Sequence, residues 1–127
     1  MGVEQSRIVI PARSKWASAT FLASILDVPA GPPREPFAPV TVGNGVSLDF
    51  VDAVGFGSHH CAFLVSEAEF DAVFARIRSA GIPYYAGPQH RRPGQVASLR
   101  GGRGVWFDDP DGHTIEITTT PPGGRLP

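Results

Sequence analysis

Residues that carry chemistry stand at four places in the chain: Arg7 in "RIVIPA", Asp49 in "VSLDFVD", the pair His59 and His60, and Glu116 in "HTIEITT". Imidazole nitrogens and carboxylate oxygens bind Zn, Fe, Mn and Ni, and both groups also move protons in enzymes. A guanidinium instead stays charged and pairs with carboxylates or other anions. If these residues meet in space, they form either a metal site or a charged binding site.

The elements that would position these residues follow from composition and periodicity. Residues 14–26 predict a helix capped by Ser14, and residues 66–81 predict a second helix. Ser66 and Glu69 have the spacing of a capping box, and Gly81 ends that helix. The strands predicted from β-branched and alternating runs are 7–12, 37–42, 46–52, 60–65, 82–87, 104–109 and 113–119. The sequence "GNG" at 43–45 predicts a hairpin turn. We also expect a long polar loop at 88–103 and a tail at 121–127.

The predicted order β-α-β-β-β occurs twice. A module of about 50 residues cannot close its own core, so the two copies, residues 6–53 and 59–120, must pair. We therefore predict an α+β domain over 1–127, in which two β-α-β-β-β modules form a cupped mixed sheet with helices on its outer face. Superposing the modules sets Arg7 opposite His60 and Asp49 opposite Glu116.

Alternation along a strand decides which of these side chains share a surface. His59 and His60 point to opposite faces, so only one of them serves a given site. Ile115 and Ile117 would pack under the helices, which places Glu116 on the open face, and the repeat places Asp49, Arg7 and His60 there too. His59 is then structural.

Aromatic residues divide between the core and a pocket. Trp16 and Phe70 are predicted in the core, since most large aromatic side chains are buried. Trp106 alternates with core-facing neighbours, and with Tyr84 and Tyr85 it suggests an aromatic wall for a ligand.

The remaining polar and reactive residues have ordinary interpretations. His113 follows the "DPDG" turn and is interpreted as a turn-end residue rather than a ligand. Cys61 is predicted on the packed face as an inert thiol. His90, Arg91 and Arg92 belong either to a solvated loop or to a lid that contacts an anionic ligand.

Bulk properties narrow the class of protein. The chain has 127 residues, a formal net charge of −1 and one cysteine. The balanced charge argues against a nucleic-acid partner, and there is no apolar run of about 18 residues to cross a membrane. We expect a cytoplasmic protein, because a signal-peptide pattern and paired cysteines are both missing from the sequence.

The doubled order, together with "IVIPAR", "HCAFLVSEAEFDAVFARIRSAGIPY" and "GVWFDDPDGHTIEI", resembles the vicinal oxygen chelate superfamily, which contains glyoxalases, bleomycin-resistance proteins and extradiol dioxygenases. The resemblance implies ligand positions at the starts of the first strands and the ends of the last strands, here Arg7, Asp49, His60 and Glu116. It also implies a homodimer that binds a small organic molecule.

Arg7 departs from that pattern, because metal-using members have His there and a guanidinium offers only donors. One hypothesis is therefore a protein that binds a small organic ligand without the standard metal, using Arg7, Asp49, Trp106, Tyr84 and Tyr85. The alternative is a lyase, isomerase or dioxygenase whose Zn, Fe, Mn or Ni ion is held by His60, Glu116 and Asp49, with His60 and Glu116 as the catalytic residues.

Overall fold

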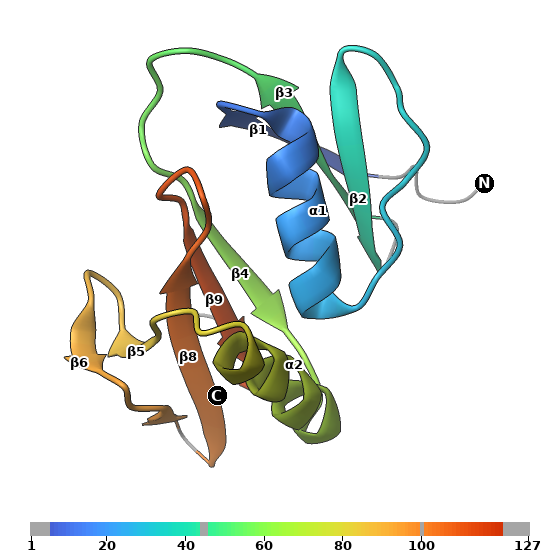
Figure 1. The fold of residues 1–127 in the computed structure, drawn as a ribbon. Coiled ribbons are helices and arrows are strands. Elements are labelled where there is room, and N and C mark those ends of the chain that lie inside the picture. Colours follow the sequence, from blue (N-terminus) through green and yellow to red (C-terminus); the bar gives the residue numbers. More distant parts are fainter. Residues whose placement is uncertain (1–5, 44–45, 100, 121–127) are drawn as a thin grey trace. The chain divides into compact units, whose positions relative to one another are not determined.

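The structure, a computed structural model, describes residues 6–43, 46–99 and 101–120. It divides into two compact units, Met1–Gly57 and Ser58–Pro127, and the boundary falls between the two predicted modules. Each unit combines a β-sheet with one helix (Figure 1). The predicted α+β class, built from mixed sheets and two helices, is confirmed.

The first unit contains β1 (Ser6–Ala12), α1 (Lys15–Leu26), β2 (Phe37–Gly43) and β3 (Val46–Asp52). Its sheet has the order β1-β3-β2, with β1 parallel and β2 antiparallel to β3. Ser14 caps α1 as predicted, because its side chain accepts a hydrogen bond from the N–H of Ala17. The predicted turn residues 44 and 45 lie outside the described residues.

The core of this unit forms where α1 packs on the sheet, with Leu22, Leu48 and Phe50 all buried. Trp16 is an exception to the predicted core, since it is 45% exposed. Consecutive residues lie about 100° apart around a helix, so Trp16 sits beside the buried stripe that begins at Lys15. The position of Trp16 around the helix, rather than the size of its side chain, therefore decides its exposure.

The second unit contains one helix and six short or medium strands among its described residues. The elements are β4 (His60–Leu64), α2 (Glu67–Ser79), β5 (Tyr85–Gly87), β6 (Arg91–Pro93), β7 (Ala97–Leu99), β8 (Gly102–Asp108) and β9 (Thr114–Thr118). The sheet has the order β4-β9-β8-β5-β6, and β7 pairs with β8.

The predicted signals at both ends of α2 are confirmed. The Ser66 side chain accepts from the N–H of Glu69, and the Glu69 side chain accepts from the N–H of Ser66. At the other end Gly81 has φ +70, a left-handed conformation that suits glycine and stops the helix. One face of α2 buries Phe70, Val73 and Ile77, whose spacing of three and four residues places them on the same side of the helix.

Two expectations about the strands need correction. The segment 88–103 is not an unstructured loop, because β6 and β7 lie within it. The two units also differ in strand number, since the described part of the first unit has β-α-β-β and the second has additional strands. Strands pair through backbone hydrogen bonds, so a polar segment that does not alternate apolar and polar side chains can still join the edge of a sheet. Amino-acid composition therefore does not reveal such a strand.

The helices α1 and α2 are 12 and 13 residues long. Within the described residues, neither is long and apolar enough to span a membrane.

Candidate active site

The site in the second unit begins with a diagonal contact between two parallel strands. In the pairing of β4 with β9, His60 stands opposite Thr114 and Ala62 stands opposite Glu116. The His60 side chain reaches along the strand, so that its Nε2 lies 2.9 Å from Oε1 of Glu116. The His60 side chain is 53% exposed and that of Glu116 only 10%. An accessible imidazole is therefore held by a shielded carboxylate.

This contact defines the proton arrangement of the imidazole. A carboxylate only accepts hydrogen bonds, so a neutral His60 donates its Nε2–H to Glu116 and keeps its Nδ1 lone pair free. A carboxylate that fixes the tautomer and orientation of a histidine is the arrangement used by general bases in enzymes. The pair is chemically equipped to take a proton from a bound molecule.

A pocket of about 470 Å³ adjoins His60 within the second unit. The sheet register explains how its residues meet, because His60 pairs with Thr114 and Thr114 pairs with Asp108. These three side chains form one row on one face of the sheet. The pocket is lined by His60, Tyr85, Gly87, Pro88, Gln89, His90, Trp106, Phe107, Asp108, Gly112 and Thr114.

A second row, next to the first, supplies aromatic surface. Trp106 pairs with Glu116 on one side and with Tyr85 on the other, so these side chains share the same face. Trp106 is 8% exposed, and its Nε1–H has no acceptor among the described residues. Buried donors are rarely left without partners in folded proteins. The unpaired N–H marks the Trp106 wall as a place for an acceptor atom.

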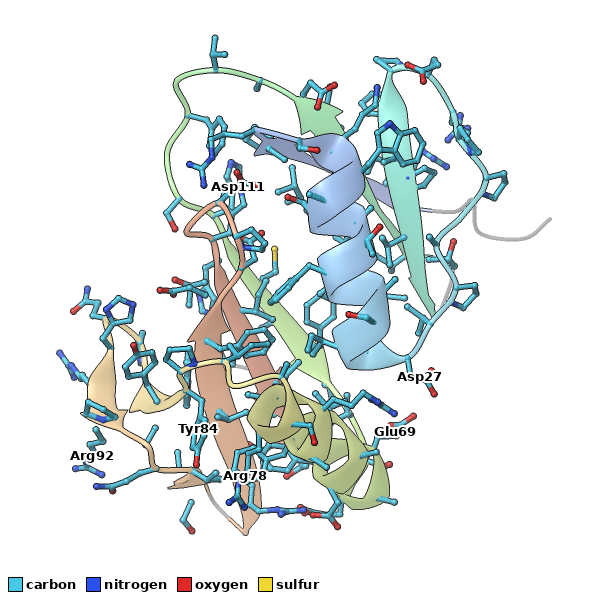
Figure 2. All side chains as sticks on the ribbon, viewed as in Figure 1. Asp27, Glu69, Arg78, Tyr84, Arg92 and Asp111 are labelled. Atoms are coloured by element: carbon cyan, nitrogen blue, oxygen red, sulfur yellow. The ribbon has the colours of Figure 1, made fainter. Side chains whose placement is uncertain are left out.

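The structure separates the two tyrosines that the sequence grouped together. Tyr85 lines the pocket, whereas Tyr84 packs edge-on against Phe74 of α2, with ring centroids 5.0 Å apart. Tyr84 is labelled in Figure 2. Neighbouring residues in an extended segment face opposite sides, so only one tyrosine joins the pocket wall.

The first unit repeats the diagonal contact with different groups. In the parallel pairing of β1 with β3, Arg7 stands opposite Ser47 and Val9 stands opposite Asp49. Nε of Arg7 donates to Oδ2 of Asp49 at 2.7 Å, and the Ser47 hydroxyl donates to Oδ1 at 2.6 Å. Asp49 is 1% exposed. Both oxygens of this buried carboxylate therefore have a donor, one of them charged.

The family follows from comparison with known proteins. Residues 11–117 match the family described as Glyoxalase/Bleomycin resistance protein/Dioxygenase superfamily. The chain belongs to this superfamily. The predicted recognition of the vicinal oxygen chelate group is confirmed.

Solved structures of high similarity carry the name of oxidases. Oxidase ChaP-H2 is 50% identical, with a TM-score of 0.91 over 97% of this chain and 98% of that protein. Oxidase ChaP-H1 is 48% identical, with a TM-score of 0.90 over 96% of this chain and 99% of that one. A third relative, metallothiol transferase FosB of Shouchella clausii, is 36% identical over 67 residues. That match spans 53% of this chain and only 42% of FosB.

Because some members of the superfamily use a metal, we compared the possible ligands His60, Glu116 and Asp49 with what a metal site needs. His60 and Glu116 offer two suitable ligand atoms in the second unit. Asp49 belongs to the first unit, and its oxygens are engaged by Arg7 and Ser47. Catalytic zinc sites use three protein ligands and an open position, so the pair alone does not fit such a site. The set of His60, Glu116 and Asp49 stays a prediction.

Another group of metal-ligand types lies in the turn between β8 and β9, where Asp111 is labelled in Figure 2. Ligand atoms of Asp109, Asp111 and His113 lie within 4.8 Å of one another. Asp109 Oδ1 accepts the N–H groups of Asp111 and His113, and His113 Nδ1 accepts the N–H of His59. Burial raises the pKa of Asp109. These contacts account for the cluster as a hydrogen-bonded turn, which agrees with the interpretation of His113.

The two residues beside His60 have structural surroundings. The ring of His59 meets that of His113 edge-on, with centroids 5.1 Å apart. Cys61 faces the opposite side from His60, and burial, with a smaller contribution from the Asp109 carboxylate, raises the pKa of its thiol. A raised pKa keeps the thiol protonated and weakens it as a nucleophile.

Sequence reasoning missed one functional feature of the pocket. Nε2 of His90 lies 2.7 Å from Oδ2 of Asp108, and both residues line the pocket. The predicted lid was based on the positive charges at residues 90–92, but the contact partner lies 18 residues further along the chain. The alternation of β8, which sets Asp108 on the face of Trp106, was the signal that could have revealed it.

Proposed function

We propose that this protein is an enzyme that binds a small hydroxylated organic molecule in the pocket of the second unit and oxidises it, without a metal at the standard superfamily position. The observation that carries the proposal is the accessible His60, held by the shielded Glu116 at the edge of an aromatic pocket. The oxidase names of ChaP-H2 and ChaP-H1, which match nearly the whole chain, support the reaction class.

The chemistry starts with a proton transfer. His60 accepts the hydroxyl proton at Nδ1, while Glu116 stabilises the resulting imidazolium through Nε2–H. The deprotonated ligand is a better electron donor than the neutral one. Dioxygen, the co-substrate, takes two electrons and two protons from it, one of these protons being released again by His60, so that hydrogen peroxide leaves and the ligand has lost two hydrogen atoms. Trp106 donates its unpaired N–H to an oxygen of the ligand, and Tyr85 packs against the ring or chain that carries it.

The first unit carries a charged pair of its own. Arg7 neutralises the buried Asp49 through Nε, and its side chain is 31% exposed, so the guanidinium remains accessible to an anionic group. We include a homodimer in the proposal, because the resemblance to the superfamily implies one.

Oxygen uptake by the purified full chain tests the reaction, with monocyclic and fused-ring phenols as probes. Uptake with at least one phenol, unchanged after dialysis against a chelator, supports the proposal. Uptake that a chelator abolishes and a divalent ion restores would favour the metal-dependent alternative. No uptake with any phenol would overturn the oxidase function.

Metal analysis separates the two hypotheses independently of turnover. The unaltered protein should hold far less than one divalent ion per chain, whereas Arg7→His should raise the metal content if Asp49, His60 and Glu116 complete a site. A stoichiometric metal in the unaltered protein, lost in both His60→Ala and Glu116→Ala, would contradict the metal-free proposal.

A further inference from the structure

The pocket carries two imidazole–carboxylate pairs, and the proposed function uses only one of them. The second pair joins Nε2 of His90 to Oδ2 of Asp108 at 2.7 Å. Its side chains are 58% and 39% exposed, so a molecule in the pocket can reach them. Surface ion pairs contribute little to stability, which leaves the placement of this one without a structural explanation.

The backbone holds His90 in place at an energetic cost. Gln89 and His90 have φ values of +62 and +59, in the left-handed region that disfavours residues with a side chain. Such tight hairpin turns usually contain Asn or Gly. Strained residues of this kind cluster at ligand sites, where the side chain is needed. The ring of His90 also stacks on Tyr85, with centroids 4.5 Å apart and planes at 30°.

The sheet register sets the span between the two pairs. His60, Thr114 and Asp108 occupy one row across β4, β9 and β8. Neighbouring strands lie nearly 5 Å apart, so the Cα atoms of His60 and Asp108 are separated by about 10 Å. A single aromatic ring with an oxygen substituent at each end fits this span. His60 therefore stands at one end of the row, and Asp108, which contacts His90, stands at the other.

We propose that His90 is a second proton-transfer residue of this pocket, and this rests on the proposed function. One proton moves from the ligand hydroxyl to Nδ1 of His60. When His90 carries a proton on both ring nitrogens, one proton moves from its Nδ1 to an acceptor oxygen at the far end of the ligand, while its Nε2–H remains donated to Asp108. The ligand loses one proton and gains one, and His90 becomes neutral. His90 is thus the acid and His60 the base.

Binding of 4-nitrophenol to the full chain tests the assignment. This probe has a hydroxyl at one end and nitro oxygens at the other. Nitro oxygens accept a hydrogen bond from His90 but are too weakly basic to take its proton, so the bound probe stops at the phenolate, which has a distinct visible absorption. The unaltered protein should bind it as the phenolate at a pH at which the free probe is mostly protonated. His90→Phe keeps a ring on Tyr85 but has no donor, so it should weaken phenolate binding about tenfold or more. Asp108→Asn, which removes the charge but retains an acceptor, should act in the same direction.

The controls distinguish this proposal from the proposed function. His60→Gln should abolish the phenolate absorption while retaining binding of the neutral probe, and His59→Gln should leave both unchanged. Normal binding in both His90→Phe and Asp108→Asn would overturn the role of His90 and leave that of His60 intact. Phenolate formation in His60→Gln, or no binding to the unaltered protein, would overturn both. Circular dichroism shows whether each variant is folded, and Asp108→Asn serves if His90→Phe is not.

Discussion

His60 contacts Glu116 diagonally across two parallel strands, with 2.9 Å between Nε2 and Oε1. Arg7 contacts Asp49 through the same diagonal step in the first unit, at 2.7 Å. In both cases the first residue stands opposite the position two before its partner. The two contacts are therefore equivalent in register and different in chemistry, one suited to moving a proton and the other to binding charge.

Replacing His60 with Gln tests the proton-transfer half of this comparison. Gln retains an N–H for Glu116 but has no basic nitrogen, so we expect a loss of oxygen uptake of about 100-fold. His59→Gln is the matched control, because the same change one residue earlier falls on the opposite face and should leave the rate within about twofold. Equal losses in both variants would show that the effect is structural.

Replacing Arg7 with Met tests the charge-binding half. The buried Asp49 carboxylate would keep only the Ser47 hydroxyl as a donor, which should lower the free energy of unfolding by about 3 kcal/mol. The double variant Arg7→Met with Asp49→Leu should recover most of that loss, because no unpaired charge remains. Urea unfolding measures all three proteins. Full stability of the single variant would mean that the ion pair does not hold Asp49.

Removing the indole N–H tests the Trp106 wall. Trp106→Phe keeps an aromatic ring, and since Nε1 has no acceptor among the described residues, no hydrogen bond is lost there. We expect the free energy of unfolding to change by less than about 1 kcal/mol, while phenol affinity falls several-fold. A large loss of stability with unchanged affinity would assign Trp106 to the core alone.

The capping box of α2 predicts a defined pH dependence. The backbone N–H and side chain of Ser66 hold the pKa of Glu69 below its ordinary value of 4.5. Glu69 therefore stabilises the fold above that value, and its contribution is lost as the pH falls through the lowered pKa. At neutral pH, Ser66→Ala should lower the free energy of unfolding by about 1 kcal/mol, and the unfolding temperature should fall with it. Glu69→Gln should lower the unfolding temperature as well.

Thermal unfolding at neutral and acidic pH provides the check. The deficit of Glu69→Gln should shrink once the pH lies below the folded pKa of Glu69, because the unaltered carboxyl is then protonated as well. A deficit that is the same at both pH values would mean that charge at Glu69 does not contribute.

Alkylation of Cys61 tests whether the packed face of β4, opposite His60, shields this thiol from solvent. Burial raises the pKa of the thiol from 9.0, so the reactive thiolate is scarcer in the folded than in the unfolded chain. Iodoacetamide should modify the folded protein much more slowly than the protein in urea at the same pH. By the same linkage, the fold should lose stability as the pH rises above the ordinary thiol pKa. Equal rates in both states would contradict a shielded thiol.

Local sequence signals predicted the parts of the fold that depend on neighbouring residues. The capping box at Ser66 and Glu69, the stop at Gly81, and the opposite faces of His60 and Cys61 all follow from residue type and strand alternation. The internal repeat also predicted that Arg7 and Asp49 would be equivalent to His60 and Glu116. These inferences need no knowledge of distant contacts, which explains why sequence alone supported them.

Features that depend on distant partners were not predictable in the same way. Asp108 becomes a partner of His90 only because β8 and the turn after β5 meet in the sheet. Likewise, the sequence left Asp49 as either a metal ligand or a partner of Arg7, and it does not show that the Ser47 hydroxyl donates to the second oxygen. The strands β6 and β7 lack alternation, since backbone pairing at a sheet edge places few demands on side chains.

The parallel pairing of the first and last strands in each unit lets the two halves evolve separately. The register alone brings the side chains at positions 7 and 49, or 60 and 116, within contact distance. A single substitution at the first strand therefore exchanges an imidazole for a guanidinium without a change in the backbone. One half of the repeated scaffold can therefore hold a pair suited to moving a proton while the other holds a pair suited to binding charge, with the same backbone register beneath both.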